Sequence, residues 1–350
     1  MKVISCASFR NTGSSAVTDL ISEYDSVHSL TRYEFRFVHD TDGIMDLEYN
    51  LIENHNRDNS NHAVKRFLRL SRFNAGKWFN KRYEPFFNGQ YMKLTEEYIA
   101  ELTDLKYHGH DFYDYYDRGL FFYYRKRLEN KIIRKLTKKR RSVLENEWMY
   151  CAYPTEEKFL DCTRKYINSL FSEANTDKKP YLLVDQIVPS SNIKKSLRYF
   201  DDIYVIVVDR DPRDLFIMAQ VFHDPIVPRN SVRDFCDWFL FTHTERYEDS
   251  LDAPRVIKIN FEDLIYNYTN TVKKIEEFTG LEAMNHTQKF SMLNPKRSVH
   301  NTQLWKRYGK KEDIEYIEKR LSDYLFPFEN YSIDSVEGIS VEDTLSLIHI

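Results

Sequence analysis

The chain has 350 residues, 42% of them apolar and 30% charged, which allows one large domain or two small ones and excludes a disordered, collagen-like or small disulfide-stabilised protein. Fifty-one Lys and Arg face 54 Asp and Glu, so the net charge of −3 gives no general attraction to nucleic acid, and any anion site must come from local clustering. The four cysteines lack the spacing of a metal site, which predicts reduced thiols and no bound metal.

The first predicted strand spans residues 2–7 and is followed directly by a loop that turns into a helix. In a chain with only nine Gly, Gly13 at this corner indicates a backbone that turns tightly or approaches a ligand closely. Two serines follow it, and an apolar pattern then marks the buried face of the helix. The N–H groups of the first helical turn favour an anion, to which Arg10 can add hydrogen bonds. The corner therefore suits a phosphate-like group, and a plain capped helix is the alternative interpretation.

This loop is not of the kind that binds nucleoside triphosphates. The pattern G-x-x-x-x-G-K-[ST] is absent, because no Lys follows Gly13 and no Gly lies five residues before it. The dinucleotide-binding fingerprint is missing as well. The anionic group must therefore be held by another route.

The second predicted strand spans residues 33–38, and His39 and Asp40 follow it. In an open parallel sheet, ligands bind outside the carboxyl ends of the strands, where these two side chains would lie. Asp185, near the end of a predicted strand at 181–186, has the same position. For each of them a strand-end cap or a surface residue is the alternative, above all for Asp40 in its turn-like sequence.

Residues 45–175 are predicted to form a large helical insertion, since they combine polar and aromatic segments at helical spacing with no convincing strand. Within it, residues 118–141 hold eleven Lys or Arg and a single acid, Glu129. Apolar residues recur there at helical spacing, which predicts an amphipathic helix with a solvated basic face. The alternatives are a patch for an anionic acceptor or an anionic membrane surface, and contact with an acidic face of the same protein.

The remaining predicted strands are 181–186, 203–209 and 255–261. The run from Ile203 to Val208 is apolar at five of six positions, which is typical of a strand buried on both faces of a parallel sheet. We therefore predict an α/β fold with a central parallel sheet flanked by helices, forming a single domain over residues 1–344 with the insertion inside it.

The ends of the chain carry two expectations about processing. No apolar run reaches the roughly 20 residues of a membrane helix, and the short apolar start does not resemble a signal peptide. These features predict a cytoplasmic protein, with peripheral contact to the inner face of the membrane if residues 118–141 bind lipid. Residues 345–350 match one reading frame of a common sequencing adaptor and are expected to be an assembly scar, with an ordinary apolar tail as the alternative.

Four blocks in order along the chain resemble sulfotransferases that use 3′-phosphoadenosine 5′-phosphosulfate, a family with a P-loop NTPase-like fold, and in particular bacterial glycan-type members. The loop at residues 10–15 resembles their 5′-phosphosulfate loop, and residues 207–214 resemble the strand end whose Arg binds the 3′-phosphate. Residues 259–281 and 294–308 resemble two later blocks, the second of which closes over the nucleotide. The donor-binding residues that this resemblance implies are Arg10, Asn11, Thr12, Gly13, Ser14, Ser15, Arg210, Lys296 and Arg297.

Two positions depart from the family's pattern. The usual cation of the loop falls on Asn11, while Arg10 lies one place earlier. Eight residues after Arg210 the family carries a Ser, whereas this chain has Met218, which cannot donate that hydrogen bond. Gln220 or a basic residue of the C-terminal loop could replace the missing contact.

The resemblance implies transfer of a sulfuryl group from this donor to a hydroxyl or amine, with a saccharide or glycolipid as acceptor, the insertion selecting it, and no metal or nucleic acid involved. Arg10 would stabilise the leaving phosphate, and the base would be His39, Asp40 or Asp185. Two other functions are compatible with the sequence: a nucleotide-dependent phosphotransferase, and a catalytically inactive nucleotide-binding module of the same fold. A further alternative is a membrane-surface protein led by residues 118–141.

Overall fold

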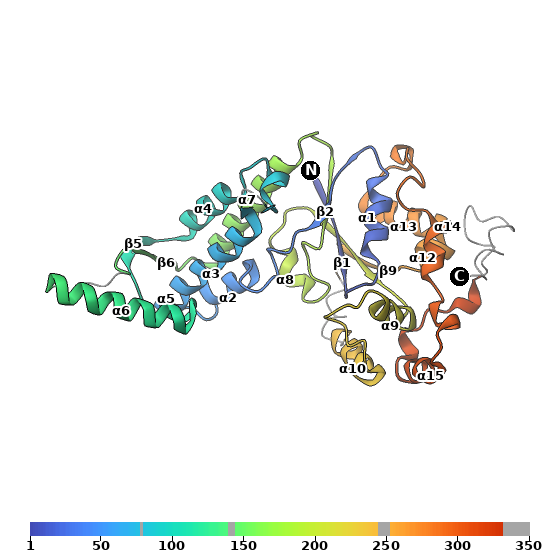
Figure 1. Ribbon diagram of the computed structural model, residues 1–350. Helices are drawn as coiled ribbons and strands as arrows, with labels where there is room; N and C mark the ends of the chain where they lie inside the picture. Colours follow the sequence, from blue (N-terminus) through green and yellow to red (C-terminus); the bar gives the residue numbers. More distant parts are fainter. Residues whose placement is uncertain (78–79, 139–143, 244–252, 332–350) are drawn as a thin grey trace. The chain divides into compact units, whose positions relative to one another are not determined.

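The computed structural model describes residues 1–77, 80–138, 144–243 and 253–331 (Figure 1). The chain divides into two compact units: unit 1 comprises Met1–Arg36 and Asn175–Ile350, and unit 2 is Phe37–Ala174. The expected scar at 345–350 lies outside the described residues, as do the last three residues of the basic segment 118–141.

Unit 1 is built on a five-stranded parallel sheet, which confirms the predicted α/β class with a central parallel sheet flanked by helices. The strand order places β1 in the middle, paired with β7 on one side and β8 on the other. Both partners are strongly apolar, and β1 and β8 are almost entirely buried, as expected of strands covered on both faces. In sheet order the strands are β2 (Val27–Glu34), β7 (Tyr181–Asp185), β1 (Lys2–Ser8), β8 (Ile203–Asp209) and β9 (Val256–Asn260).

Helices bury the apolar residues of this sheet. One core cluster joins β1 and β8 to α1, α12 and α13 through fully buried residues such as Ile4, Leu20 and Ile206. A second joins α9, α10 and α15 around Phe216 and Phe235. The helices among the described residues of unit 1 are α1 (Ser14–Ser22), α8 (Ile193–Leu197), α9 (Pro212–Val221), α10 (Val232–Thr242), α12 (Asp263–Tyr266), α13 (Tyr268–Thr279), α14 (Pro295–Ser298) and α15 (Lys311–Arg320), with 3-10 helices η2 (Ala283–Asn285), η3 (Val299–Asn301), η4 (Leu304–Arg307), η5 (Ser322–Tyr324) and η6 (Phe328–Asn330).

The strand predicted at 33–38 is wrong in position. β2 ends at Glu34, and the chain then leaves the sheet in a turn that contains His39 and Asp40. β2 lies at the edge of the sheet, where one face meets solvent, so its sequence is too polar to stand out as a strand. Phe35 and Phe37 are fully buried outside any strand, so the apolar alternation there reflects core packing rather than strand pairing.

The described residues of unit 2 form helices and four short strands, whereas the sequence pattern predicts helices without strands. The strands form two antiparallel pairs, β3 with β4 and β5 with β6. They escape prediction because they are short and because four of the five residues of β5 are exposed, so no apolar alternation marks them. The elements are α2 (Ile44–Leu51), α3 (Arg57–Ala75), β3 (Gly76–Lys77), β4 (Asn80–Lys81), the 3-10 helix η1 (Glu84–Phe87), α4 (Tyr91–Leu102), β5 (Leu105–Gly109), α5 (Tyr113–Tyr116), α6 (Gly119–Thr137), β6 (Glu147–Cys151) and α7 (Glu156–Ala174).

The helix predicted within 118–141 is present as α6. None of its residues is buried, so the apolar side that the sequence pattern assigns to a core is not packed into one. Among the described residues, no helix combines the length and the apolar character needed to cross a membrane.

Candidate functional site

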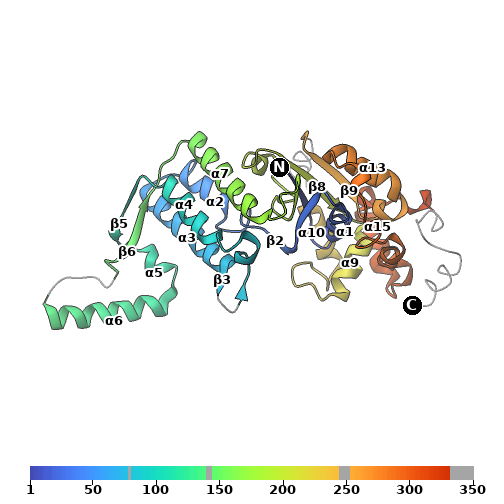
Figure 2. The same cartoon turned by 90° about the horizontal axis from the view of Figure 1, so that it is seen from above.

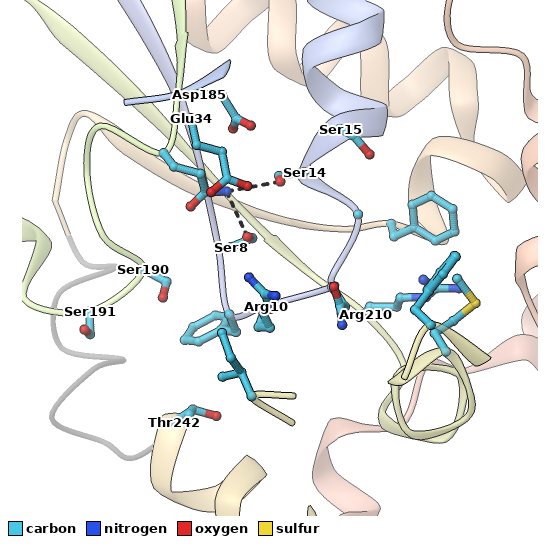
Figure 3. Close-up of a pocket in the computed structure, with 18 of the residues that line it drawn as sticks. Ser8, Arg10, Ser14, Ser15, Glu34, Asp185, Ser190, Ser191, Arg210 and Thr242 are labelled. Atoms are coloured by element: carbon cyan, nitrogen blue, oxygen red, sulfur yellow. Dashed lines mark hydrogen bonds between the residues drawn. The ribbon is translucent and has the colours of Figure 1, made fainter. Parts of the chain in front are cut away.

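A cavity of about 670 Å³ opens where four strands of unit 1 end (Figure 3). Ser8, Glu34 and Asp185 close β1, β2 and β7, and Arg210 follows β8 directly. This is the carboxyl edge of the parallel sheet, the usual ligand-binding edge of open α/β folds. The cavity is lined by Ser8, Phe9, Arg10, Asn11, Gly13, Ser14, Ser15, Glu34, Arg36, Asp185, Gln186, Ser190, Ser191, Arg210, Met218, Phe222, Ile226, Trp238, Thr242, Phe261 and Asn301.

The loop between β1 and α1 has an unusual backbone. Arg10, Asn11 and Gly13 have φ of 94°, 55° and 90°, so three of four consecutive residues are left-handed. Successive N–H groups in such turns form concave sites that bind anions. The loop leads into α1, whose first turn contains no acidic residue and whose N-terminus has no side-chain cap. The backbone and the helix dipole therefore both favour a negative charge here.

Two contacts fix this loop to the sheet. Thr12 is fully buried, and its hydroxyl donates to the carbonyl oxygen of Val208 in β8 at 2.5 Å. Gly13 lies against the ring of Phe261, so that a Cβ at position 13 would stand only 2.6 Å from the ring carbon Cδ2. Only glycine fits both the left-handed backbone and this close approach.

Gln186 connects the start of the loop to the start of the helix. It follows β7 with a left-handed φ of 57°, and its side-chain amide donates to the hydroxyls of Ser8 at 2.9 Å and Ser14 at 3.1 Å, as the dashed lines in Figure 3 show. These hydroxyls are thereby held at the cavity wall.

Arg210 brings a second cation to the same cavity. Its guanidinium lies 4.7 Å from the centroid of the Phe261 ring, the same ring that contacts Gly13, and one Nη donates to the carbonyl oxygen of Asn301. Its Nε is buried without a hydrogen-bond partner, and the described residues give it no ion pair. The nearby Arg213, by contrast, is paired with Asp211 and Glu318. The buried carboxyl groups of Asp214 and Glu262 interact with Arg210 electrostatically, but neither forms an ion pair with it among the described residues, so the guanidinium can still bind an anionic ligand.

Asp185 is the cavity's unusual carboxyl group. It is 9% exposed, and its Oδ1 has no hydrogen-bond partner among the described residues. Burial, together with the carboxylate of Glu34, raises the pKa of Asp185 to about 7. A carboxyl group with this pKa can accept and release a proton near neutral pH.

Arg10 and Asn11 are both held by one acidic side chain. Asp224 accepts from Arg10 Nε at 3.0 Å and from the Asn11 side-chain amide at 2.6 Å. Burial opposes ionisation of Asp224, but hydrogen bonds from the Ile226 amide, Asn11 and Arg10 outweigh it and lower the pKa of this carboxyl. Asp224 thus fixes the side chains of the loop's two left-handed polar residues.

Most of the residues that the sequence predicts for the donor site lie together at the cavity, but not all of them. Arg10, the small loop residues and Arg210 line it or support it, as does Asp185. Lys296 and Arg297 are not among its lining residues, and Arg297 donates instead to the carbonyl oxygen of Met292 at 3.2 Å. Their part in nucleotide binding stays a prediction.

The two other predicted bases do not belong to this cavity's wall. His39 and Asp40 lie in unit 2 and are absent from the lining, in a turn rather than at a strand end. Glu34 and Arg36, which the sequence analysis did not single out, line the cavity at the end of β2. A prediction that ended β2 at Glu34 would have placed this carboxylate at the ligand-binding edge of the sheet.

Met218 lines the cavity, so the missing Ser hydroxyl of the family pattern corresponds to an apolar stretch of wall. Gln220 does not compensate at the wall, because it is not a lining residue and its side-chain oxygen accepts from the Tyr308 hydroxyl at 3.1 Å. Among the described residues, no cluster of three or more His, Cys, Asp or Glu side chains could hold a metal ion.

No family model and no curated protein matches the chain, whereas nine chains of solved structures, among them the following three, align with it at low sequence identity. A retinol dehydratase in complex with androsterone and the inactive cofactor PAP is 15% identical, with a TM-score of 0.37, over 93% of this chain and 81% of that chain. The sulfotransferase domain of the Synechococcus PCC 7002 olefin synthase is 13% identical, with a TM-score of 0.39, over 99% and 92%. The sulfotransferase STF9 from Mycobacterium avium is 12% identical, with a TM-score of 0.37, over 95% and 77%. At these values the likeness assigns neither a fold family nor an activity, so function has to be derived from the site.

Proposed function

We propose that this chain is a sulfotransferase that moves the sulfuryl group of 3′-phosphoadenosine 5′-phosphosulfate to a hydroxyl or amine acceptor. One observation carries the proposal: the left-handed loop before α1 and Arg210 after β8 line the same cavity and contact the same ring, Phe261. Two separate anion-binding features in one cavity suit a ligand with phosphate at both ends of a nucleoside.

The two features divide the donor between them. The loop amides and the first turn of α1 hold the 5′-phosphosulfate, and the guanidinium of Arg210, which lines the cavity, holds the 3′-phosphate. The rings of Phe9, Phe222 and Trp238 line the cavity and offer faces for the adenine base. The family's Ser contact to the 3′-phosphate is lost at Met218, which leaves Arg210 as the main determinant of that end.

Asp185 is the base in this proposal. Its carboxylate removes the proton from the acceptor hydroxyl as the acceptor oxygen forms a bond to sulfur. The bond between sulfur and the phosphate oxygen breaks, and adenosine 3′,5′-bisphosphate leaves with the negative charge. The loop amides and Arg10, which line the cavity, stabilise that charge.

The acceptor in this proposal is a saccharide or glycolipid, selected by unit 2. That unit has a hollow of about 320 Å³ in which Trp148 and Tyr150 lie beside basic residues of α3. An aromatic face and hydrogen-bonding side chains in one hollow suit a sugar ring. The lining residues are Lys65, Leu68, Arg69, Arg72, Asp114, Asp117, Arg118, Glu147, Trp148 and Tyr150.

The test is titration calorimetry with adenosine 3′,5′-bisphosphate, adenosine 5′-monophosphate and ATP. The wild-type chain should prefer the bisphosphate. Arg210→Gln should weaken bisphosphate binding by about 10- to 100-fold, the loss of one hydrogen bond to a charged group, and leave the monophosphate unaffected. The control is Arg255→Gln, since Arg255 is exposed, donates to the Asp201 carbonyl oxygen and lies outside the cavity wall.

Other outcomes would replace the proposal. A preference for ATP would indicate a nucleotide-dependent phosphotransferase. Tight bisphosphate binding without transfer of labelled sulfate to any member of a saccharide and glycolipid panel would indicate an inactive binding module. If Arg210→Gln weakened binding of the bisphosphate and of the monophosphate equally, Arg210 would not be the residue that binds the 3′-phosphate.

A further inference from the structure

Helix α6 (Gly119–Thr137) has a surface that the proposed function does not use. Every fourth residue is large and apolar, in the row Leu120, Tyr124, Leu128, Ile132 and Leu136, and none of the row is less than 49% exposed. A helix of a globular protein normally buries such residues. Figure 2 shows α6 as one continuous helix, and its main described contact is with the short α5. Exposed apolar residues in this number mark an interaction surface.

The spacing of the row indicates the shape of what it contacts. With 3.6 residues per turn, each step of four residues rotates by about 40°, so five residues spread over about 160° of the helix. A coiled-coil seam alternates steps of three and four and stays on one side. The α6 row therefore forms a broad face that fits a flat partner better than a narrow helical groove.

Cations lie within this same broad face. Lys131 and Lys135 fall between row residues in the helical projection, and neither makes an ion pair among the described residues. The only acid of the helix, Glu129, falls at the edge of this face, about 20° beyond Leu136 in the projection, and Lys126 at 2.7 Å and Arg125 at 3.5 Å offset its charge. A protein groove would bury the two lysines, whereas at a bilayer their long stems let the ammonium groups reach anionic headgroups.

We propose that α6 binds an anionic lipid bilayer, lying in the plane of the interface with the Leu120–Leu136 row inserted below the headgroups. The attraction is local, because the whole chain carries a net charge of −3 while α6 holds six Lys or Arg and one Glu. The proposal is independent of the activity proposed for unit 1. Binding of α6 to a bilayer would bring a transferase with a glycolipid acceptor close to its substrate.

Sedimentation of the full chain with vesicles tests the proposal. The protein should bind vesicles made of equal parts phosphatidylglycerol and phosphatidylcholine, but it should not bind vesicles of phosphatidylcholine alone. Lys131→Gln/Lys135→Gln should weaken binding about 30-fold, since each Lys near an anionic surface contributes about fivefold. The matched control is Lys93→Gln/Lys158→Gln, which removes the same charge from exposed residues of α4 and α7. Salt near 1 M should release the protein.

A second pair of measurements tests insertion of the row. Leu128→Ser/Ile132→Ser should also weaken vesicle binding while leaving circular dichroism and thermal melting unchanged, because neither side chain is buried. In Tyr124→Trp, the added fluorescence should shift to shorter wavelength on binding. Equal effects of the test and control lysine pairs would overturn the proposal. So would binding to double-stranded DNA or an acidic protein in place of the anionic vesicles.

Discussion

Of the two carboxyl groups that line the cavity, Asp185 has the environment that differs more from that of an ordinary surface carboxyl group. It is buried, it faces the carboxylate of Glu34, and its Oδ1 has no partner among the described residues. A fold gains no stability from such an arrangement, because an ionised carboxylate in an apolar setting is costly. Buried groups with shifted pKa values concentrate at functional sites, which is why Asp185 is the proposed base.

The first prediction concerns Asp185→Asn. Transfer should fall by about 10²- to 10⁴-fold, the usual contribution of a general base. In the wild type, kcat/KM should rise with pH and level off above about 7, since the base acts only when deprotonated. Glu34→Gln should move the midpoint of this profile to lower pH, because it removes the repulsion that helps to raise the pKa of Asp185. Initial rates of labelled sulfate transfer against pH measure both effects.

Stability should change in the opposite direction. The folded pKa of Asp185 is raised, so the wild type loses stability as the pH rises from the ordinary Asp range through about 7. Asp185→Asn should therefore melt at a higher temperature than the wild type at pH 8 and show a smaller advantage at pH 4. The control is Asp19→Asn, a carboxyl of α1 outside the cavity wall, which should keep its activity. A flat pH profile, or full activity of Asp185→Asn, would contradict the assignment.

At the scale of elements, the corner between β1 and α1 was predictable because its signals are local. Gly13, the following serines and the apolar face of α1 are neighbours in sequence, and the apolar run before Arg210 marks β8 directly. Asp224 and Glu34 were not predictable in the same way. Asp224 lies 214 positions from Arg10 in the sequence, so no local pattern indicates their contact. Glu34 ends an edge strand that is too polar to be recognised as a strand from its sequence.

The second prediction concerns this corner and uses two glycines. Gly13→Ala should lower the free energy of unfolding by more than the roughly 1 kcal/mol that a left-handed backbone alone costs, because its Cβ also meets the Phe261 ring. It should also abolish detectable bisphosphate binding. Gly89→Ala is the matched control: its φ is +71°, yet nothing lies within 4 Å of its added Cβ. Urea unfolding and calorimetry measure the two effects. Equal losses of stability and of binding in Gly13→Ala and Gly89→Ala would show that the contact with Phe261 is not the cause.

At the scale of the whole molecule, the two units differ in how the chain builds them. Unit 2 is one continuous segment with its own aromatic core, including Phe67, Tyr91 and Phe159. Unit 1 is assembled from two segments on either side of it, and the whole candidate donor cavity belongs to unit 1. Nucleotide binding should therefore stabilise one unit selectively.

The third prediction follows from this division. Adenosine 3′,5′-bisphosphate at 100 times its Kd should stabilise unit 1 by about 2.7 kcal/mol. Hydrogen exchange should then slow in β1, α1 and β8 and stay unchanged in α3 and α4 of unit 2. Equal slowing in both units would show that they unfold as one.

The central position of β1 has a consequence for the order of events during synthesis. β1 leaves the ribosome well before its two partners, which begin only at Tyr181 and Ile203. At translation rates of about 5–20 residues per second, this apolar strand waits roughly 10 to 40 s until both neighbours have been made. Unit 2 emerges complete in the meantime. The nascent chain thus carries a finished domain and an unprotected strand together, the condition in which chaperones are most needed.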